Sequence, residues 1–411
     1  MKKKVKIKDI ALYSKGTQIN GDELLDEAKF DYLNGGIKPS GKWDNANCVA
    51  NTVTISEGGN SCGYVNFMKN PFWCGAHCYF LYDTKIDSKY LYYALKSQQV
   101  HIMKLRSGAC MPNIKKTDLG NFEFVCDDNS IEQKKITHIL DKLECVIEQR
   151  KNEIQVFDEL VKARFIEVFG DAIHNPMEWP VKKLGELSSQ INSGNTPKGG
   201  QQVYVDKGIT FFRSQNVWKN KLEMDDIAYI DEATHASMSR SSLKHGDILM
   251  TKTGRINTEN SSLGRAALYM GKDDAANVNG HVYFIRLKPG INNKFILRIL
   301  ISDEYRDYIR SVCVGGIDKR QLNKEHIEDF PIICPPVKLI EKYIAFTEQA
   351  DKSKLSNISI IYTLFVGMAY TLPGTLALYL CAKLSPVNGD MGVPFQVRSR
   401  YFSRLAVLKL S

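Results

Sequence analysis

The sequence lacks the features of a secreted protein. Its start, MKKKVKIKD, is charged and is not followed by the apolar core of a signal peptide. Its ten cysteines are scattered along a long chain and do not form a compact disulfide framework. We therefore expect reduced thiols and a cytoplasmic protein.

A common metal-binding spacing is also missing. Cys74, His77 and Cys78 form a tight cluster with Cys48 and Cys62 upstream, but these intervals fit no common zinc finger. The segment HCYFLYD, which begins at His77, alternates like a buried strand. Zinc remains an alternative here, but the strand is favoured, and we expect no metal.

Motifs for catalysis are absent as well. The chain contains no phosphate-binding G-x-x-x-x-G-K-[ST] loop. The segment NPFW at Asn70 lacks the second proline of an adenine methyltransferase motif, and no glycine-rich cofactor loop precedes it. Asp127, Asp128 and Glu132 could be mistaken for a nuclease cluster, yet they lie at a helix start, where acidic groups stabilise the helix dipole. We expect no catalytic residue and no cofactor.

The composition is that of a folded protein with an excess of positive charge. With 411 residues and 43% apolar content, the chain is long enough for two domains with full cores. Its 55 Lys and Arg residues outnumber 46 Asp and Glu residues, which gives a formal net charge of +9. Such an excess favours a polyanionic partner, although it also occurs in proteins that bind no nucleic acid.

One long periodic segment, IEQKKITHILDKLECVIEQRKNEIQVFDELVKARFIEVFGD, divides the chain. Its apolar residues recur with a heptad spacing, which is typical of a helix that packs lengthwise on another helix. Ser130 and Gln133 have the spacing of a capping box, and Gly170 is placed to end the helix. A helix of roughly 40 residues would be about 60 Å long. The predicted packing seam consists of Leu140, Leu143, Ile147, Ile154, Phe157, Val161 and Val168.

The segments on either side of this helix resemble each other. VKIKDIALYSKGTQING resembles VKKLGELSSQINSGNTPKG, TVTISEGGNSCGYV parallels DILMTKTGRINTENSSLGRA, and HCYFLYD parallels HVYFIRL. His77 and His281 match in this comparison, and each borders an aromatic strand, so we expect a structural or rim role for both. A repeated sequence implies a repeated structure. The order is therefore domain, helix, domain, helix.

The two domain endings complete a pattern that resembles the specificity subunit of type I restriction-modification systems. Residues 108–136 and 316–344 both run from glycine through a polar turn, a short amphipathic segment and a strand to a helix start. Proteins of that family have two target-recognition domains in tandem, with a long helix after each. The resemblance covers residues 1 to about 354.

This resemblance implies an α+β protein with two tandem target-recognition domains separated by a long coiled-coil-forming helix. The expected boundaries are 1–128 for the first domain, 129–171 for the helix, 172–334 for the second domain, 335–356 for the start of a second helix and 357–411 for an atypical tail. It also implies a non-catalytic DNA reader of a bipartite target, whose paired antiparallel helices set the gap between the half-sites. The implied partners are double-stranded DNA, modification (methyltransferase) subunits and, through them, restriction subunits.

Loops rich in glycine and polar residues carry the candidate DNA contacts, because Arg, Lys and Asn side chains hold phosphates and read base edges. A solvated surface charge is the alternative for each residue taken alone. The candidates are Lys15, Lys38, Lys42, Asn45, Arg106, Asn113 and Lys115 in the first domain and Lys198, Arg213, Asn216, Arg255, Arg265 and Arg320 in the second.

The end of the chain departs from the repeat. The expected second helix starts as VKLIEKYIAFTEQADKSK, but from Asn357 the sequence NISIIYTLFVGMAYTLPGTLALYLCA contains no charge. Such a run could span a bilayer, but we favour a rearranged end that truncates the second helix, because nothing upstream is built for a membrane. On this interpretation the seam of the first helix lacks its partner, and self-association through the spacer helix becomes a further alternative.

Two other functions remain open on the sequence alone. The chain could be the recognition part of a fused restriction-methylation enzyme, although no catalytic domain precedes Val5. It could also be a membrane-tethered remnant, if the uncharged run were a membrane segment.

Overall fold

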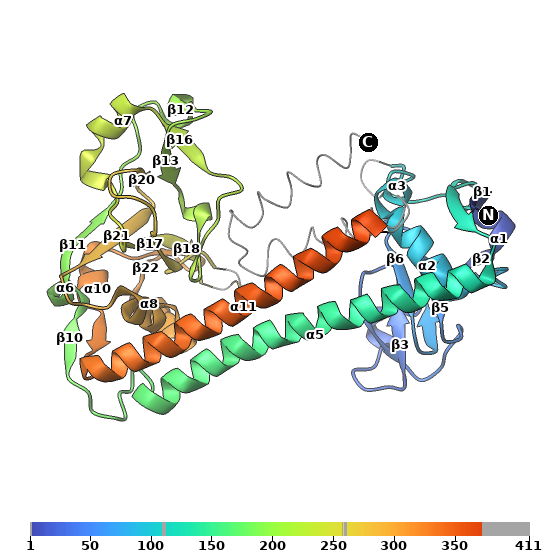
Figure 1. Cartoon of the computed structure of the whole chain (residues 1–411), viewed down its shortest axis with the longest axis horizontal. Helices are drawn as coiled ribbons and strands as arrows, with labels where there is room; N and C mark the ends of the chain where they lie inside the picture. The colour runs from blue at the N-terminus through green and yellow to red at the C-terminus, as the bar shows by residue number, and fades with distance from the viewer. Residues whose placement is uncertain (1, 109–111, 257, 259–260, 372–411) are drawn as a thin grey trace. The chain divides into compact units, whose positions relative to one another are not determined.

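The computed structural model describes residues 2–108, 112–256, 258 and 261–371, and the chain divides into two compact units. The first unit contains residues 1–154 and 355–411, and the second contains residues 155–354. Two long helices contribute to both units, because α5 (Ser130–Phe169) and α11 (Val337–Thr371) cross the boundaries between them. Each unit therefore consists of one α+β domain and a stretch of each long helix (Figure 1).

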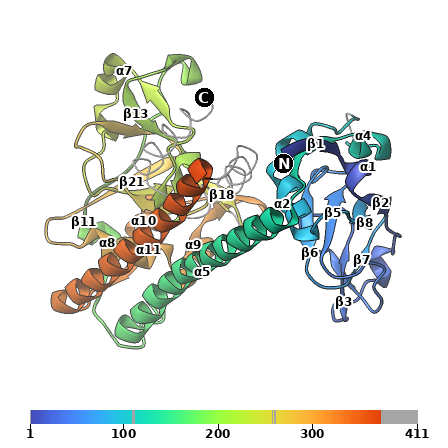
Figure 2. The same cartoon turned by 45° about the vertical axis from the view of Figure 1, so that its right-hand side comes forward.

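The first unit is built on a four-stranded antiparallel sheet of order β2-β8-β5-β6. Its central strand β5 has the sequence TVTIS, and all five residues are buried, as expected for a β-branched segment covered on both faces. Helix α2 lies between this sheet and α5 (Figure 2). The bounds of these elements are β2 (Leu12–Lys15), β5 (Thr52–Ser56), β6 (Val65–Met68), β8 (Cys78–Tyr82) and α2 (Ser88–Ser97).

Two smaller sheets complete the first unit. One has the order β4-β3-β7, in which β3 and β7 are parallel, and the other pairs β1 with β9. The strands are β1 (Lys2–Lys6), β3 (Phe30–Leu33), β4 (Gly41–Trp43), β7 (Phe72–Cys74) and β9 (Glu123–Asp127), and the remaining short helices are α1 (Ile7–Ile10), α3 (Gln99–Met103) and α4 (Lys116–Gly120).

The second unit has a central sheet with an equivalent strand order, β11-β21-β17-β19. A second sheet of order β12-β16-β13-β20 again contains one parallel pair, β13 with β20, and β10 pairs with β24. The strands of these sheets are β10 (Val181–Lys183), β11 (Ser188–Ser193), β12 (Tyr204–Val205), β13 (Ile209–Phe212), β16 (Ala228–Ile230), β17 (Ile248–Thr251), β19 (Ala266–Leu268), β20 (Ala276–Val278), β21 (Val282–Leu287) and β24 (Pro331–Ile333).

Further elements of the second unit surround these sheets. A hairpin joins β14 to β15, and a small sheet has the order β18-β23-β22. These strands are β14 (Val217–Trp218), β15 (Lys221–Leu222), β18 (Thr253–Arg255), β22 (Val314–Gly315) and β23 (Lys319–Gln321), and the helices are α6 (Leu184–Leu187), α7 (Glu232–Ser237), α8 (Asn293–Ile301), α9 (Asp303–Val312) and α10 (Lys324–Glu328).

The predicted duplication and the α+β class are confirmed by the order and pairing of the strands. In each unit a short terminal pair of strands precedes a long helix, a four-stranded antiparallel sheet forms the core, and an accessory sheet contains one parallel pair. Sequence similarity this weak could not show which strands are neighbours, because pairing depends on contacts between distant segments.

The first long helix begins at Ser130, but the predicted capping box is wrong. Asn129 is the cap, because its Oδ1 accepts the N–H groups of Ile131 and Glu132 at 3.0 and 3.4 Å. The Gln133 side chain turns away from this role and donates to the Asp127 carbonyl at 2.7 Å. The predicted end is confirmed, since α5 stops before Gly170, whose φ of +74° favours glycine.

In the first unit, α5 packs against α11 and α2. Leu140, Ile147 and Ile154 of α5 share one core with Ile358 and Ile361 of α11. Helix α2 is joined to α5 by the Tyr93 hydroxyl, which donates to Asp141 Oδ1 at 2.6 Å and to Glu144 Oε2 at 3.1 Å. Burial and these carboxylates raise the pKa of Tyr93, so the hydroxyl keeps its proton and remains a donor.

In the second unit, four aromatic rings join the long helices to the domain. Phe165 and Phe169 of α5 lie within 6 Å of the ring of Phe295 on α8, with centroid separations of 5.9 and 5.0 Å. Tyr343 of α11 packs edge-on against both phenylalanines of α5, and its hydroxyl donates to the Val161 carbonyl at 3.3 Å. Lys354 pairs with Asp158 at 2.8 Å, so the two helices run antiparallel here.

The second helix continues well past the predicted boundary at 356. Helix α11 extends to Thr371, and the expected break near Asn357 is wrong. The uncharged segment supplies Ile358, Ile361 and Tyr362 at helical spacing, and these side chains are buried in the first unit. The absence of charge therefore reflects an apolar helix face. Residues 372–411 of the predicted tail lie outside the described part of the chain.

This packing bears on the two alternatives for the tail. Among the described residues, no helix is both long and apolar enough to cross a membrane. The seam residues Leu140, Ile147, Ile154 and Val161 are buried within the chain, so α11 covers the surface through which a second copy would have bound.

Candidate nucleic-acid interface

A buried glutamate holds two basic side chains at one face of the first unit. The Glu57 carboxylate lies 2.7 Å from Lys15 Nζ and 3.3 Å from His77 Nδ1. Only 11% of the Glu57 side chain is exposed, against 43% for Lys15 and 63% for His77. The carboxylate thus fixes two groups that remain open to a ligand.

Local backbone geometry sets the position of Lys15. Lys15 ends β2 opposite Tyr79 of β8, and its Nζ lies 5.6 Å from the centre of the Tyr79 ring. Gly16 follows, and a Cβ at this position would lie 1.8 Å from the Cys74 carbonyl oxygen. Only glycine lets the chain approach β7 this closely, so the direction of the Lys15 side chain follows from its neighbour.

Two amide side chains extend this network. The backbone N–H of His77 donates to Asn34 Oδ1 at 3.1 Å, and Asn34 Nδ2 donates to Gln18 Oε1 at 3.1 Å. Gln18 is exposed and Asn34 is half-buried. Amide groups placed in this way can donate to and accept from the edges of bases.

The segment before α4 is tied to the same glutamate. Ser107 and Asn113 exchange backbone hydrogen bonds of 2.9 Å, and the Ile114 N–H donates to the Glu57 carbonyl at 2.9 Å. The Tyr79 hydroxyl donates to the Ile114 carbonyl at 3.0 Å. Burial and the charge of Glu57 raise the pKa of Tyr79 to about 12, which keeps this donor protonated.

The structure brings some of the predicted residues of the first unit together and places others elsewhere. Lys15 pairs with the Glu57 side chain, and Asn113 precedes Ile114, which bonds to the Glu57 backbone. The side chains of Arg106 and Lys115, next to Ser107 and Ile114 in the sequence, are exposed. Three further predicted contacts are exposed on or beside β4 of the small sheet, namely Lys38, Lys42 and Asn45.

The backbone arrangement around Glu57, His77, Tyr79 and Ile114 is called the scaffold below. The second unit repeats this scaffold with different side chains. The backbone N–H of Lys252 donates to the His281 carbonyl at 2.9 Å. In the first unit the backbone N–H of Glu57 donates to the His77 carbonyl at 2.8 Å in the same way. The Leu322 N–H donates to the Lys252 carbonyl at 2.9 Å, and the Tyr283 hydroxyl donates to the Leu322 carbonyl at 3.3 Å. Lys252 therefore occupies the position of Glu57, and its Nζ lies 5.7 Å from the Tyr283 ring centre.

Two predicted arginines lie on adjacent strands beside Lys252. Arg255 of β18 is opposite Lys319 of β23, and Arg320 follows on the same strand. The Arg255 side chain is 67% exposed and pairs with Asp318 at 3.3 Å. Lys198 is exposed on the loop after β11. The small sheet therefore carries three cationic residues, Arg255, Lys319 and Arg320, beside Lys252.

Two of the predicted DNA contacts have interior side chains. Asn216 is 1% exposed, and its amide holds the loop through the backbone of Arg213, Glu223 and Asp226. Arg265 is also buried, with its guanidinium 3.8 Å from the Trp218 ring centre. Burial lowers the pKa of Arg265.

Arg213 is largely committed to its own domain. Its Nη2 donates to the Asp226 carbonyl at 2.5 Å and lies 3.1 Å from the Asp226 carboxylate. Hydrogen bonds from Gln215 and Arg213 hold the pKa of Asp226 below its usual value. A DNA contact by Arg213 would have to compete with this pairing.

The sequence interpretation missed Glu57, Lys252, Tyr79, Tyr283 and Asn34. A signal for the first two was present, because aligning TVTISE with DILMTK places Glu57 opposite Lys252. The polar role of Glu57 depends on β8 and on Ile114, which are distant in the sequence and lie beside it only in the folded chain.

Three buried cysteines of the first unit pack among apolar side chains. Cys48, Cys74 and Cys78 lie in one apolar cluster with Leu33 and Phe72. In the described part of the chain, no group of three or more His, Cys, Asp and Glu residues could hold a metal ion.

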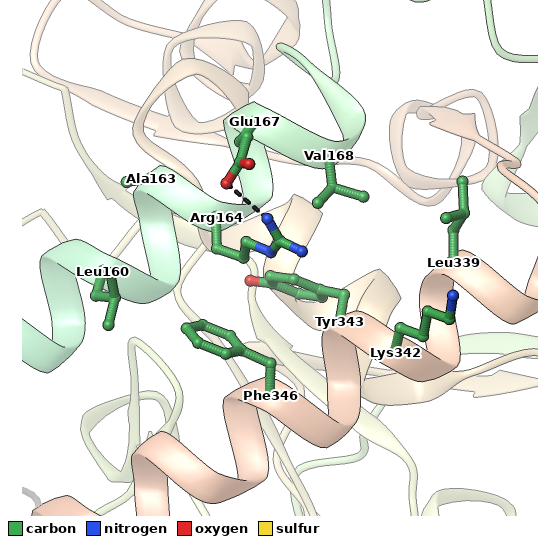
Figure 3. Close-up of a pocket in the computed structure, with 9 residues that line it drawn as sticks. All are labelled: Leu160, Ala163, Arg164, Glu167, Val168, Leu339, Lys342, Tyr343 and Phe346. Carbon is green, nitrogen blue, oxygen red and sulfur yellow. Dashed lines mark ion pairs between the residues drawn. The ribbon is translucent and has the colours of Figure 1, made fainter.

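A groove runs between the two long helices in the second unit (Figure 3). Its volume is about 390 Å³, and Tyr343 and Phe346 of α11 face Leu160 and Val168 of α5 across it. Arg164 also lines the groove, and it pairs with Glu167 at 2.8 Å (Figure 3).

Comparison with known proteins agrees with this architecture. Residues 2–156 match the family described as the type I restriction modification DNA specificity domain. The structure is similar to the crystal structure of the S subunit of a type I restriction-modification system from M. genitalium, with a TM-score of 0.59 and 21% sequence identity over 92% of this chain and 96% of that one. The fold of this chain is therefore similar to that of the M. genitalium S subunit.

Two relatives support the assignment in sequence. A Mycoplasma pneumoniae protein named as a type I specificity subunit is 32% identical over 47% of this chain and 52% of its own length. A Methanocaldococcus jannaschii type I restriction enzyme specificity subunit is 24% identical over 72% of this chain and 70% of its own length. Residues 2–156 thus match the DNA specificity domain family, and the chain is similar to type I specificity subunits. It spans about half the length of the M. pneumoniae relative that it matches.

Proposed function

We propose that this chain recognises duplex DNA and that each unit reads one half of a bipartite target. The observation that carries the proposal is the repeated scaffold, which presents Lys15 in the first unit and Lys252 in the second on equivalent backbone frames. Lys15 is exposed and Lys252 is half-buried, and accessible cations of this kind hold phosphates and fix the position of a protein on DNA. The net charge of +9 agrees with a polyanionic ligand.

The groups around each scaffold divide between two tasks. Lys15, Lys115 and Arg255 are exposed cations suited to phosphates. Asn113, Gln18 and Asn34 in the first unit and Arg320 in the second have the donors and acceptors that base edges require. We assign half-site specificity to this second group and much of the affinity to the first.

We further propose that the chain is non-catalytic and directs modification subunits, and restriction subunits through them, to the target. The long helices are the candidate docking surface, since α5 and α11 carry exposed side chains such as Leu160 beside a groove with an apolar floor. The 40 residues of α5 correspond to a rod of about 60 Å, which exceeds one helical turn of DNA.

The proposal is tested by expressing the chain together with a modification subunit from the same system and mapping methylated adenines in cells. We expect methylation at a motif with two specified parts and an unspecified gap, which disappears when the chain is left out. A single uninterrupted motif would contradict two readers, and unchanged methylation without the chain would contradict its role in specificity.

Docking can be tested separately from DNA binding. Leu160→Asp introduces a charge at the groove and should reduce capture of the modification subunit, whereas Lys142→Asp changes an exposed position of α5 that does not line the groove. Equal capture by both variants would place the docking surface elsewhere.

A further inference from the structure

The two scaffolds carry opposite charges at one equivalent position. Glu57 and Lys252 both donate their backbone N–H to a histidine carbonyl and accept from the segment before α4 or α10 through their own carbonyl. The Glu57 side chain is an anion paired with Lys15 and His77. Lys252 is a half-buried cation, and among the described residues no carboxylate lies within ion-pair distance of its Nζ.

A second pair of positions shows the complementary exchange. Lys15 lies opposite Tyr79 in the pairing of β2 with β8, and Ser193 lies opposite Tyr283 in the pairing of β11 with β21. Gly16 and Gly194 follow these residues, and a Cβ on either would lie within about 2 Å of a carbonyl oxygen. Lys15 and Ser193 are therefore at equivalent positions. The lysine is at the end of β2 in the first unit, whereas in the second unit it is Lys252, which directly follows β17.

The ammonium group nevertheless reaches the same place in both units. Lys15 Nζ lies 5.6 Å from the ring centre of Tyr79, and Lys252 Nζ lies 5.7 Å from that of Tyr283. Each tyrosine also donates its hydroxyl to the segment before the following helix. An ammonium above an aromatic face is stabilised there and keeps donors free for a second ligand.

We propose that Lys15 and Lys252 are the equivalent phosphate-holding cations of the two units, and that Glu57 is a positioning residue that offsets the charge of Lys15. The inference rests on the proposed DNA-binding function. The Lys15 and Glu57 pair has a formal charge of zero, whereas the Ser193 and Lys252 pair has a formal charge of +1. The first unit therefore holds its phosphate through a fixed, compensated cation and the second through an uncompensated one.

This difference has a measurable consequence. Binding of a cation to a phosphate releases counterions, and each uncompensated contact adds about 0.9 to the slope of log affinity against log salt. The contact at Lys252 should contribute this full amount, whereas Glu57 reduces the contribution of Lys15. Glu57 itself has both oxygens engaged and little exposure, so it is not expected to read a base.

The test measures binding of the full chain to a duplex of arbitrary sequence, by fluorescence anisotropy over a series of KCl concentrations. Lys252→Met should lower the magnitude of the salt slope by about 0.9, and Lys252→Arg should leave it unchanged. Glu57→Gln should raise the slope and tighten binding at low salt, because it keeps the shape of the side chain and frees the Lys15 charge. The double variant Glu57→Gln with Lys15→Met should lose that gain.

Lys142→Met, at an exposed position of α5, is the matched control for loss of one surface charge. Thermal unfolding identifies any variant that has lost its fold, and the charge-keeping Lys252→Arg then still tests the second unit. A parallel decrease in slope for Glu57→Gln and Lys252→Met would overturn the inference, as would unchanged slopes for both. A wild-type chain without salt-dependent binding would instead overturn the proposed function itself.

Discussion

Arg150 Nη1 donates to Asn357 Oδ1 at 3.3 Å, which places a polar contact within the helix packing of the first unit. Asn357 is 6% exposed, and its neighbours in that core are apolar. Arg150 also pairs with Glu153 at 2.8 Å. A polar pair at a helix seam costs stability but favours one register over others, because a shifted helix would leave the polar groups without partners.

Asn357→Ala should therefore destabilise the first unit. A hydrogen bond to a charged group contributes about 1.5 to 3 kcal/mol, and its loss leaves a half-buried guanidinium with one partner fewer. We expect a decrease of about this size in the free energy of unfolding, measured by urea denaturation. Ser359→Ala, at an exposed position of the same helix, should change it by less than about 0.5 kcal/mol. Equal losses in the two variants would remove the special role of Asn357.

Phe169→Ala should destabilise the second unit more strongly. Phe169 is 0% exposed and contacts the rings of Phe165, Phe295 and Tyr343. Truncation of a buried phenylalanine costs about 3 to 5 kcal/mol through lost transfer free energy and a new cavity. Phe346→Ala serves as the comparison, because Phe346 is half-buried beside the groove. A loss at Phe346 as large as that at Phe169 would contradict this account of the aromatic cluster.

The free energy of unfolding of the second unit should decrease in acid as the Asp303 carboxylate becomes protonated. Asp303 lies 3.0 Å from Lys162 of α5 and 3.2 Å from Lys219, and the hydrogen bond from Lys162 is the main reason that its pKa lies below its usual 3.8. A lowered pKa in the folded state stabilises the protein above the unfolded pKa, and the contribution is lost as the pH falls through the folded pKa.

Asp303→Asn tests this dependence. Its side chain is largely exposed and screened by solvent, so we expect a loss of only about 0.5 to 1 kcal/mol at neutral pH. The difference from wild type should shrink as the pH falls below the usual carboxyl pKa of 3.8 and through the lower folded-state pKa, as measured by urea denaturation at several pH values. Asp307→Asn, which breaks only a pair with Arg310 within α9, is the control and should cost less. A constant difference at all pH values would refute the ion-pair explanation.

Substitution of one arginine should affect one half-site only. Arg320→Ala or Arg255→Ala should weaken binding to the half-site read by the second unit by roughly 1 to 3 kcal/mol and leave the sequence preference at the other half-site intact. Selection of binding sites from a randomised duplex pool measures both preferences at once. Equal losses of preference at both half-sites would contradict a model with two independent readers.

The sequence by itself determined the architecture of domain, helix, domain, helix. Heptad spacing identified α5, since a period of 3.5 residues is a local property of the chain, and Gly170 marked its end because of its backbone freedom. The repeated segments predicted two similar domains, and strand order confirms them. Loop composition predicted basic DNA contacts, and candidates such as Lys42 and Arg255 are exposed.

Only the tertiary structure decided which polar residues face solvent and where the second helix ends. Asn216 and Arg265 occur in polar segments like the exposed candidates, but the fold buries both side chains. Asn216 hydrogen-bonds to the backbone of its own loop, and the Arg265 guanidinium lies against the ring of Trp218, 47 residues earlier in the chain. The uncharged sequence around Ile358 and Ile361 predicted a break in the repeat. In the structure these side chains continue the helix and pack against α5 in the core of the first unit. Glu57 meets Lys15 across 42 residues of sequence, and such a contact depends on strand pairing rather than on local pattern.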